Sequence, residues 1–407
     1  MTKVAIIGGG AAGMMTAATL ALRDDFQWTI TIFEKNKSLG AKVIISGWWR
    51  CNLTTGYYRS RDLLPHYTRG GEFAQQIFKQ YSPKKIRQRF EDRGIRTKEE
   101  SDHRVFPVSD DGREVVGMYE QLFAERGVSL HFREWVKSIT HDEDWFTLTT
   151  DQDTYHFNRV VITTGGNAYT QTWSTGDGYA FARMLGHRVT PLGPSLNSFL
   201  TTQKYLHELS WIAFPSARLT RHGGSCTWPV LLTHFGLSWP ATFVLASQSA
   251  FETISQDHPL SIHFQPDATT SADDRDQLLL DAVADHPRKT IFTILSQHFP
   301  KRFAEAVIHQ TWIDMQTPIG TLTRDQRLNL SSLLGNGLPI TIVGRRPGDE
   351  FVTAGGVARE EIDPQTMQSR LVPWLYFAGE VVDVDGVTGW YNLQRCWASA
   401  AVVGESI

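Results

Sequence analysis

The chain has 407 residues, of which 41% are hydrophobic and 20% are charged, and its formal net charge is −3. This composition is typical of a globular protein with a large core, and the length allows about two or three domains. The charge argues against a nucleic-acid-binding surface spread over the chain, no apolar run approaches the length of a membrane span, and the first residues predict a strand rather than a signal peptide.

The N-terminal segment has the pattern of an adenine-dinucleotide site. A short apolar run leads into Gly-Gly-Gly-Ala-Ala-Gly, which precedes a predicted helix over residues 11–23. Gly8 allows the sharp turn, Gly10 lets the backbone approach a pyrophosphate, and Gly13 lets the helix pack against the strand. A second apolar run ends about 20 residues later at Glu34, whose carboxylate would bind a ribose 2′-hydroxyl and repel a 2′-phosphate. The nucleotide is therefore FAD or NAD rather than NADP.

Alternating strands and helices are expected as far as about residue 185. After Glu34 we expect an irregular stretch over residues 36–61 and basic helical segments around residues 73–90. Apolar residues on one face, followed by Gly127, predict a helix over residues 114–126. Further strands are predicted over residues 130–132, 136–140, 145–149 and 157–163, and a further helix over residues 177–185.

The character of the chain changes near His187. Residues 187–270 have short alternating runs typical of β-rich structure, residues 271–336 have helical patterns, and residues 337–347 supply a return strand. The α/β character returns over residues 348–407. We therefore expect one nucleotide-binding domain, made of residues 1–186 and 348–407, that is split by an insertion. Within these parts we expect strands over residues 216–220, 230–233, 260–264, 339–343 and 375–378, and helices over residues 276–283, 290–297, 302–309 and 393–403.

The C-terminal part offers a second half for a long cofactor. The strand over residues 375–378 ends in Gly379-Glu380, and a helix follows. Glu380 would bind ribityl hydroxyls, and the backbone N–H groups of the helix start would bind the electron-rich edge of a flavin. In the alternative, Asp383 and Asp385 belong to a solvated acidic loop. FAD is long enough to need both this segment and the N-terminal fingerprint, so the pair favours FAD over NAD.

Several longer stretches resemble the BaiN-type flavoprotein family of NAD(P)/FAD-dependent, aminoacetone-oxidase-like oxidoreductases. They are residues 40–47 with Arg50-Cys51-Asn52, and residues 104–109, 174–178, 233–238, 352–357 and 375–394. The resemblance implies an α/β fold, in which a Rossmann-like FAD-binding domain is interrupted by an inserted β-barrel and a small helical domain. It also implies that Ser46, Arg50, Cys51 and Asn52 lie beside the isoalloxazine or the pyrophosphate.

The fingerprint and the resemblance together give a set of expected cofactor-binding residues. No metal ligand is expected, and no catalytic residue is singled out, because a flavin supplies the redox chemistry itself. The expected set is Gly8, Gly10, Ala11, Ala12, Gly13, Glu34, Lys35, Lys42, Ser46, Gly47, Arg50, Cys51, Asn52, Val136, Thr164, Gly165, Gly166, Thr353, Gly355, Gly356, Val357, Gly379, Glu380, Asp385, Gly389, Tyr391 and Asn392.

Some of these residues also have structural interpretations. Thr164 to Gly166 end a predicted strand, either at a cofactor or as a plain turn. Arg50 pairs with phosphate or reduced-flavin charge, or else forms a surface salt bridge. Cys51 is redox-active or an inert buried thiol. His103 and His234 titrate in the range of a proton donor, but the sequence shows no partner for either, which favours structural or surface roles.

The tryptophans depart from the family pattern. Trp48, Trp49, Trp239 and Trp390 stand where the family has glycine, and so do Trp173, Trp228 and Trp374. Tight turns and close approaches favour glycine, because it lacks a Cβ and adopts positive φ freely. One hypothesis is that a stop codon is decoded as glycine in the organism and as tryptophan in the printed chain. The alternative is an aromatic-lined pocket in which indoles stack on the flavin.

The expected function is that of an FAD-dependent oxidoreductase, which transfers hydride between the flavin and a small organic substrate. Because one dinucleotide fingerprint is present, NAD(P)H would dock transiently as the reductant. The family is linked to enone reduction on steroid-like compounds and to amine oxidation, and the sequence chooses neither. The alternative is a flavin-binding RNA-modifying or accessory protein without independent redox turnover.

The expected partner is a small-molecule substrate. Neither nucleic acid nor a membrane is expected to bind the protein. Three widely separated cysteines, Cys51, Cys226 and Cys396, fit a cytoplasmic location better than a disulfide framework. If the tryptophans are real, a folded protein without cofactor is a third possibility.

Overall fold

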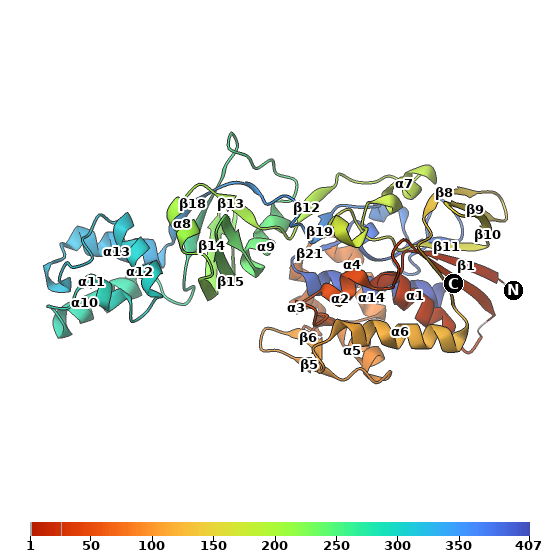
Figure 1. Ribbon diagram of the computed structural model, residues 1–407, viewed down its shortest axis with the longest axis horizontal. Helices are drawn as coiled ribbons and strands as arrows, with labels where there is room; N and C mark the ends of the chain where they lie inside the picture. Colours follow the sequence, from red (N-terminus) through yellow and green to blue (C-terminus); the bar gives the residue numbers. More distant parts are fainter. Residues whose placement is uncertain (1, 26) are drawn as a thin grey trace. The chain divides into compact units, whose positions relative to one another are not determined.

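The computed structural model describes residues 2–25 and 27–407. Its contacts divide the chain into two compact units, one formed by residues 1–195 together with 350–407, and one by residues 196–349. The larger unit is therefore discontinuous in sequence. The elements of both units are labelled in Figure 1.

The larger unit is built on a five-stranded sheet with the order β20-β11-β1-β2-β7. Its strands are β1 (Thr2–Ile7), β2 (Trp28–Glu34), β7 (Ser129–Phe132), β11 (Arg159–Ile162) and β20 (Leu375–Phe377). All neighbouring strands pair in parallel. Val4, Ala5 and Ile6 in the central strand are fully buried, as expected where both faces of a parallel sheet are covered.

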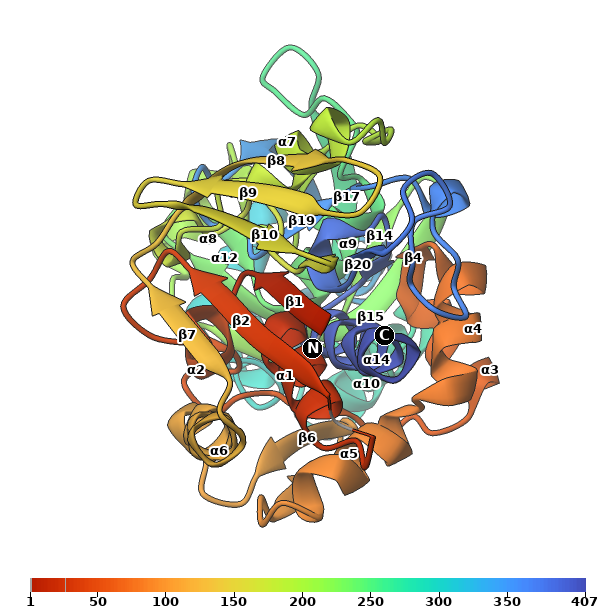
Figure 2. The ribbon, with the colours of Figure 1, turned by 90° about the vertical axis from the view of Figure 1, so that its right-hand side faces the viewer.

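Different layers cover the two faces of this sheet (Figure 2). On one face lies the antiparallel sheet of β8 (Val136–His141), β9 (Phe146–Thr150) and β10 (Thr154–Phe157), where Phe33 of β2 packs against Tyr155 with ring centroids 5.2 Å apart. On the other face lie α1 (Ala11–Ala21) and α14 (Gly389–Ser406). Every residue of α1 is buried, so this helix forms the centre of the unit.

Small sheets tie the first and last parts of the larger unit together. β4 (Tyr67–Arg69) pairs with β21 (Asp385–Gly386), and β12 (Gly193–Ser195) pairs with β19 (Val352–Ala354). A third small sheet joins β3 (Thr54–Thr55), β5 (Thr97–Glu99) and β6 (Arg104–Pro107). Helices α4 (Gly71–Gln80) and α5 (Pro83–Glu91) lie between these strands in sequence, and α7 (Asp177–Met184) follows β11.

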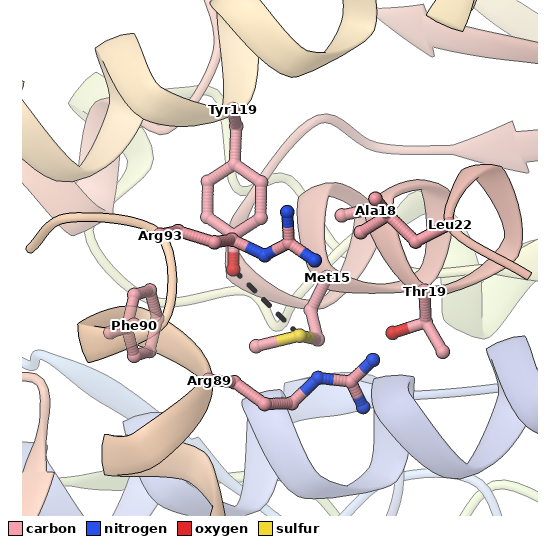
Figure 3. Close-up of a pocket in the computed structure, with 8 residues that line it drawn as sticks. All are labelled: Met15, Ala18, Thr19, Leu22, Arg89, Phe90, Arg93 and Tyr119. Atoms are coloured by element: carbon pink, nitrogen blue, oxygen red, sulfur yellow. Dashed lines mark hydrogen bonds between the residues drawn. The ribbon is translucent and has the colours of Figure 1, made fainter.

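A small pocket lies between α1, α5 and α6 (Gly112–Arg126) in the larger unit (Figure 3). The Tyr119 hydroxyl contacts the Met15 sulfur at 3.8 Å across it. None of the eight residues that line it belongs to the expected cofactor-binding set, so the pocket is separate from that set. The lining residues are Met15, Ala18, Thr19, Leu22, Arg89, Phe90, Arg93 and Tyr119.

The smaller unit contains a closed barrel with the strand order β13-β16-β15-β14-β17-β18. Closure leaves no free sheet edge. The helices α10 to α13 fall between β17 and β18 in sequence, and Phe303 of α12 packs edge-on against Phe214 of the barrel at 4.8 Å. The bounds are β13 (Phe199–Thr201), β14 (Ala213–Arg221), β15 (Gly224–Thr233), β16 (Gly236–Ser238), β17 (Leu260–Gln265), β18 (Leu338–Arg345), α8 (Lys204–Glu208), α9 (Pro240–Gln248), α10 (Ala272–Asp285), α11 (Ile291–Leu295), α12 (Lys301–Gln310) and α13 (Arg324–Gly335).

The expected fold class is confirmed, and several of the expected elements differ in detail. The final helix begins at Gly389 rather than at residue 393, because Asn392 N–H donates to the Thr388 carbonyl at 3.3 Å and so closes a first helical turn. The strand expected over residues 157–163 is two strands, β10 and β11, which a turn at Asn158 separates. The stretch expected to be irregular contains the short helix α2 (Ala41–Ile45) and the strand β3. Within the described residues, no helix has both the length and the apolar character needed to cross a membrane.

Trp397 is the largest fully buried side chain of the larger unit, and it supplies a stability test. Its Nε1 donates to the Leu53 carbonyl at 3.0 Å, and its ring lies 5.3 Å from that of Phe90. Trp397→Phe leaves that carbonyl without a donor, so the free energy of unfolding should fall by about 1–3 kcal/mol. Urea unfolding measures the loss, and Trp145→Phe, at a residue that is 41% exposed, should leave it unchanged.

Candidate functional site

The glycine fingerprint has the geometry that requires glycine. Gly8 has φ +107°, and a Cβ there would lie 2.6 Å from the Thr163 carbonyl oxygen. A Cβ on Gly13 would lie 1.9 Å from the Gly8 carbonyl oxygen. At Gly10 a Cβ would meet none of the described residues within 4 Å, so the turn leaves open space where a pyrophosphate is expected to approach.

Glu34 lies directly beside this turn. Its carboxylate accepts hydrogen bonds from Gly9 N at 2.7 Å and from Asn36 N at 2.8 Å. The neighbouring Lys35 Nζ is 2.5 Å from an Asp177 carboxylate oxygen, so its charge is balanced within the protein. Val136, also in the expected set, is buried at the start of β8. These residues gather at the end of β2 expected to hold the ribose.

Glu380 brings together four segments that are far apart in sequence. Its Oε1 accepts a hydrogen bond from Thr353 N at 3.0 Å, and its Oε2 lies 3.2 Å from Lys42 Nζ. A Cβ on Gly166 would lie 2.6 Å from both Glu380 Oε1 and Thr353 Oγ1. The strand end after β11 therefore needs glycine in order to pack against this buried carboxylate.

Asp383 and Asp385 are 6% and 0% exposed, so the alternative of a solvated acidic loop is wrong. Asp385 Oδ2 accepts from Arg69 Nε at 2.7 Å and from Gly355 N at 3.2 Å. Burial raises the pKa of Asp385, although the nearby Arg395 and Arg69 charges oppose this. The Gly355 loop is fixed further by Val357, whose N–H donates to the Val381 carbonyl at 2.8 Å.

Both helices that start at the expected cofactor segments have open N-termini. Neither α1 nor α14 has a side-chain cap or an acidic residue in its first turn. Near the α14 start, Asn392 Nδ2 donates to the Gly386 carbonyl at 2.7 Å and to the Thr388 carbonyl at 2.9 Å, which holds the segment from β21 into the helix. Such helix ends attract negative charge, as a pyrophosphate and the electron-rich edge of a flavin provide.

The loop over residues 46–52 is compact. Ser46 Oγ donates to the Val43 carbonyl at 2.8 Å, and the Ser46 carbonyl accepts from Cys51 N at 2.9 Å. Burial raises the pKa of the Cys51 thiol to about 12, so the thiol stays protonated. The Arg50 guanidinium lies 2.5 Å from a Glu100 carboxylate oxygen and 2.7 Å from one of Asp110. These contacts are the salt bridges that the second interpretation of Arg50 expects.

The chemistry of the site fits FAD. Each of four residues in the cofactor segments has a buried side-chain oxygen without a hydrogen-bond partner in the described part of the chain. Buried polar atoms are normally paired, and the hydroxyl, carbonyl and ring nitrogen groups of FAD would pair them. These atoms are Asn52 Oδ1, Thr164 Oγ1, Asp385 Oδ1 and Thr388 Oγ1.

Two arginines of the site were not expected from the sequence. Arg69 lies between the stretch expected to be irregular and the expected helical segments, and nothing local marks it. Arg395 is 3% exposed, and its Nη1 donates to the Val382 carbonyl at 3.0 Å. The sequence did offer a signal for Arg395, because it is a charged residue in the first half of a helix that is mostly buried. Of the two histidines, His103 belongs to the larger unit, and His234, which is exposed, belongs to the smaller one.

The chain is similar to known proteins over its whole length. The model of the HI0933-like protein Rossmann domain matches residues 2–406. A 3-dehydro-bile acid delta(4,6)-reductase of Clostridium scindens is 27% identical over 100% of this chain and 99% of that protein. A ribosomal RNA dihydrouridine synthase of Escherichia coli is 30% identical over 99% of this chain and 97% of that protein. Among solved structures, a 3-ketosteroid delta1-dehydrogenase from Sterolibacterium denitrificans gives a TM-score of 0.49 at 11% identity, over 100% of this chain and 99% of that one.

The fingerprint geometry gives a binding test. Gly13→Ala places a methyl group against the Gly8 carbonyl and should weaken FAD binding by more than about tenfold, a loss of about 1.4 kcal/mol. Gly117→Ala is the matched control, because a Cβ there meets none of the described residues within 4 Å. Titration of the apoprotein with FAD, followed by flavin fluorescence, measures both. Equal affinity in the two variants would contradict the assignment of this turn to the cofactor.

Proposed function

Because the chain belongs to the HI0933-like family, which it matches over residues 2–406, we propose that it saturates a carbon–carbon double bond conjugated with a carbonyl group. Family membership confirms the resemblance inferred from the sequence motifs, and the protein is an FAD-dependent oxidoreductase. The proposed electron source is NADH or NADPH, which docks transiently because the sequence carries one dinucleotide fingerprint.

Two relatives with different substrates share one kind of reacting group. The double bonds removed by a 3-dehydro-bile acid delta(4,6)-reductase are conjugated with a keto group, and the double bond lost when uridine becomes dihydrouridine is conjugated with a ring carbonyl. Reduction of a double bond directly beside the carbonyl adds a hydride to its far carbon and a proton to the carbon next to the carbonyl. This shared chemistry is the observation that carries the proposal, since the chain aligns with both relatives over at least 99% of its length.

The reaction needs a proton donor beside the hydride source. FAD, when bound and reduced, would supply the hydride. The chain itself supplies the proton, from a group that stays protonated near neutral pH.

A stack of four rings ends at the expected flavin motif and offers this donor. Tyr391, near the start of α14, lies parallel to His66, with ring centroids 4.5 Å apart and an interplanar angle of 10°. Tyr57 stacks on His66 at 5.1 Å, and His103 lies 4.5 Å from Tyr57. His103 Nδ1 is 2.9 Å from a Glu99 carboxylate oxygen, which anchors the outer end of this ring stack.

Burial sets the protonation of the ring stack. It raises the pKa of Tyr391 and of Tyr57, and it lowers the pKa of His66. Near pH 7 both phenols therefore keep their protons and His66 is neutral. We assign proton donation to Tyr391, because it is the member of the ring stack that belongs to the expected cofactor motif.

Within this class of reaction there are two candidate substrates, a small-molecule enone and a uridine within RNA. The similarity to ribosomal RNA dihydrouridine synthases favours the uridine, and so does the local charge of α5, which carries Lys84, Lys85, Arg87 and Arg89 against one acid, Glu91. Lys84 and Lys85 are exposed. The expectation that nucleic acid is no partner stays a prediction, and one experiment compares the two candidates.

The purified protein should be yellow, and NADH or NADPH should bleach its flavin under anaerobic conditions. Stopped-flow spectroscopy then follows the return of colour after mixing with a 3-keto-4-ene steroid or with unmodified ribosomal RNA. We expect one of these to reoxidise the flavin, which identifies the substrate class. Reoxidation by neither substrate would contradict double-bond reduction.

Tyr391→Phe tests the proton donor. Flavin reduction by NAD(P)H should keep its rate, whereas reoxidation by the substrate should slow by about 10²–10⁴-fold, the usual contribution of a general acid. Tyr119→Phe is the matched control, since it removes another buried phenol outside the site. A Tyr391→Phe variant that slows both half-reactions equally would show that the hydroxyl has a structural role instead.

A further inference from the structure

Half of the left-handed residues other than glycine are tryptophan. Among the described residues, 14 residues other than glycine have positive φ, and seven of these are tryptophan. The chain has 13 tryptophans in all, so more than half of them stand in this conformation. Their φ angles run from 59° to 80°, and the positions are 48, 49, 173, 211, 239, 312 and 374.

A left-handed backbone strongly selects against tryptophan. It brings Cβ against the following carbonyl oxygen, a contact that glycine alone avoids. Asparagine and aspartate tolerate the conformation through local hydrogen bonds of a short polar side chain, which an indole cannot make. A concentration of tryptophan in this region therefore conflicts with its stereochemistry.

The conflict is sharpest in the loop over residues 46–52. Gly47, Trp48 and Trp49 have φ of 58°, 62° and 70° in succession. Residues with a side chain enter this region singly, not in runs. Three glycines in a row would adopt the same turn freely, in the loop that the family resemblance places at the cofactor.

Other positions are places where helices normally use glycine. Trp239 has φ 80° and ψ 179°, a region essentially confined to glycine. Trp312 comes just after Thr311, the C-terminal cap of α12, where a left-handed glycine commonly ends a helix. Trp173, with φ 63° and ψ 21°, ends a short 3-10 helix in the same way.

The indoles at these positions mostly project into water. Trp48, Trp211 and Trp312 are 82%, 82% and 95% exposed. Tryptophan is highly buried on average, as Trp397 is in this protein. An aromatic-lined flavin pocket would require buried, stacked indoles, so the exposure argues against that alternative.

We infer that the functional protein carries glycine at these seven positions, and that Gly47 opens a three-glycine turn in the cofactor loop. These seven positions differ from the seven tryptophans that stand at glycine positions of the family pattern. Trp211 and Trp312 join the set, whereas Trp228 and Trp390 leave it, because neither has positive φ. The common cause is one codon, a stop codon that the organism decodes as glycine.

The gene gives the first test. The seven positions should carry UGA, and Trp397, whose indole is packed and hydrogen-bonded, should carry UGG. Mass spectrometry of the tryptic peptide Val43–Arg50, from protein isolated from its own organism, should find glycine at positions 48 and 49. UGG codons at the seven positions, or tryptophan in that peptide, would overturn the inference.

The recombinant chain gives a second test that needs no native material. Trp312→Gly should raise the folding equilibrium constant by about tenfold, because it relieves one left-handed residue. Trp145→Gly makes the same chemical change at a residue that is 41% exposed and not left-handed, and it should bring no gain. Equal effects of the two substitutions would contradict the inference.

All seven substitutions together should raise the melting temperature further and increase the FAD content of the purified protein. If the chain with tryptophan does not fold, recovery of folded, yellow protein by the sevenfold variant supports the inference. A sevenfold variant no more stable than the Trp145→Gly variant would overturn it.

Discussion

The packing of α1 against α14 is the constraint on which the larger unit depends. Thr16 Oγ1 donates to the Ala400 carbonyl at 3.4 Å, and a Cβ on Gly404 would lie 2.5 Å from the Thr19 Cβ. These contacts join the first helix of the chain to the last. The larger unit is complete only when the two ends of the chain pack together. The residues between them can therefore form a separate unit, as the barrel and its helices do over residues 196–349. Small residues at the contact let the helices approach closely enough to share one face of the sheet.

The same packing aligns the charges of the cofactor site. Thr16 meets Ala400 and Thr19 meets Gly404, so residue numbers rise together and the two helices run in the same direction. A Cβ on Gly379, which precedes α14, would lie 2.8 Å from Ala12 in the first turn of α1. The uncapped, partly positive N-termini of both helices therefore lie at the same end of the pair. Parallel dipoles repel weakly, and a ligand with negative charge at that end offsets the repulsion.

The sequence predicted best what is local in the chain. Gly8, Gly13 and Glu34 belong to one short segment, and the stereochemistry of that segment is enough to assign their roles. Lys42 with Glu380 and Arg69 with Asp385 are pairs separated by 338 and 316 residues. No spacing rule links such residues, and Arg69 carried no signal at all. The start of α14 was missed for another reason: Thr-Gly-Trp-Tyr-Asn has the composition of a turn, whereas the packing of Asn392 against Gly386 and Thr388 makes it helical.

The disagreements between residue type and backbone separate into two kinds. At Gly389 the tertiary contacts override a local preference, and the hydrogen bonds from Asn392 to the Gly386 and Thr388 carbonyls hold the start of the helix. At Trp48, Trp49 and Trp239 a large indole instead stands on a backbone with positive φ, which favours glycine. Natural sequences agree with their folds at each level, except where function demands strain. Functional strain would be confined to one site, but these residues are spread over both units and share a single side-chain type. Because these residues share a type but not a location, their common cause is the decoding of one codon and not the chemistry of the site.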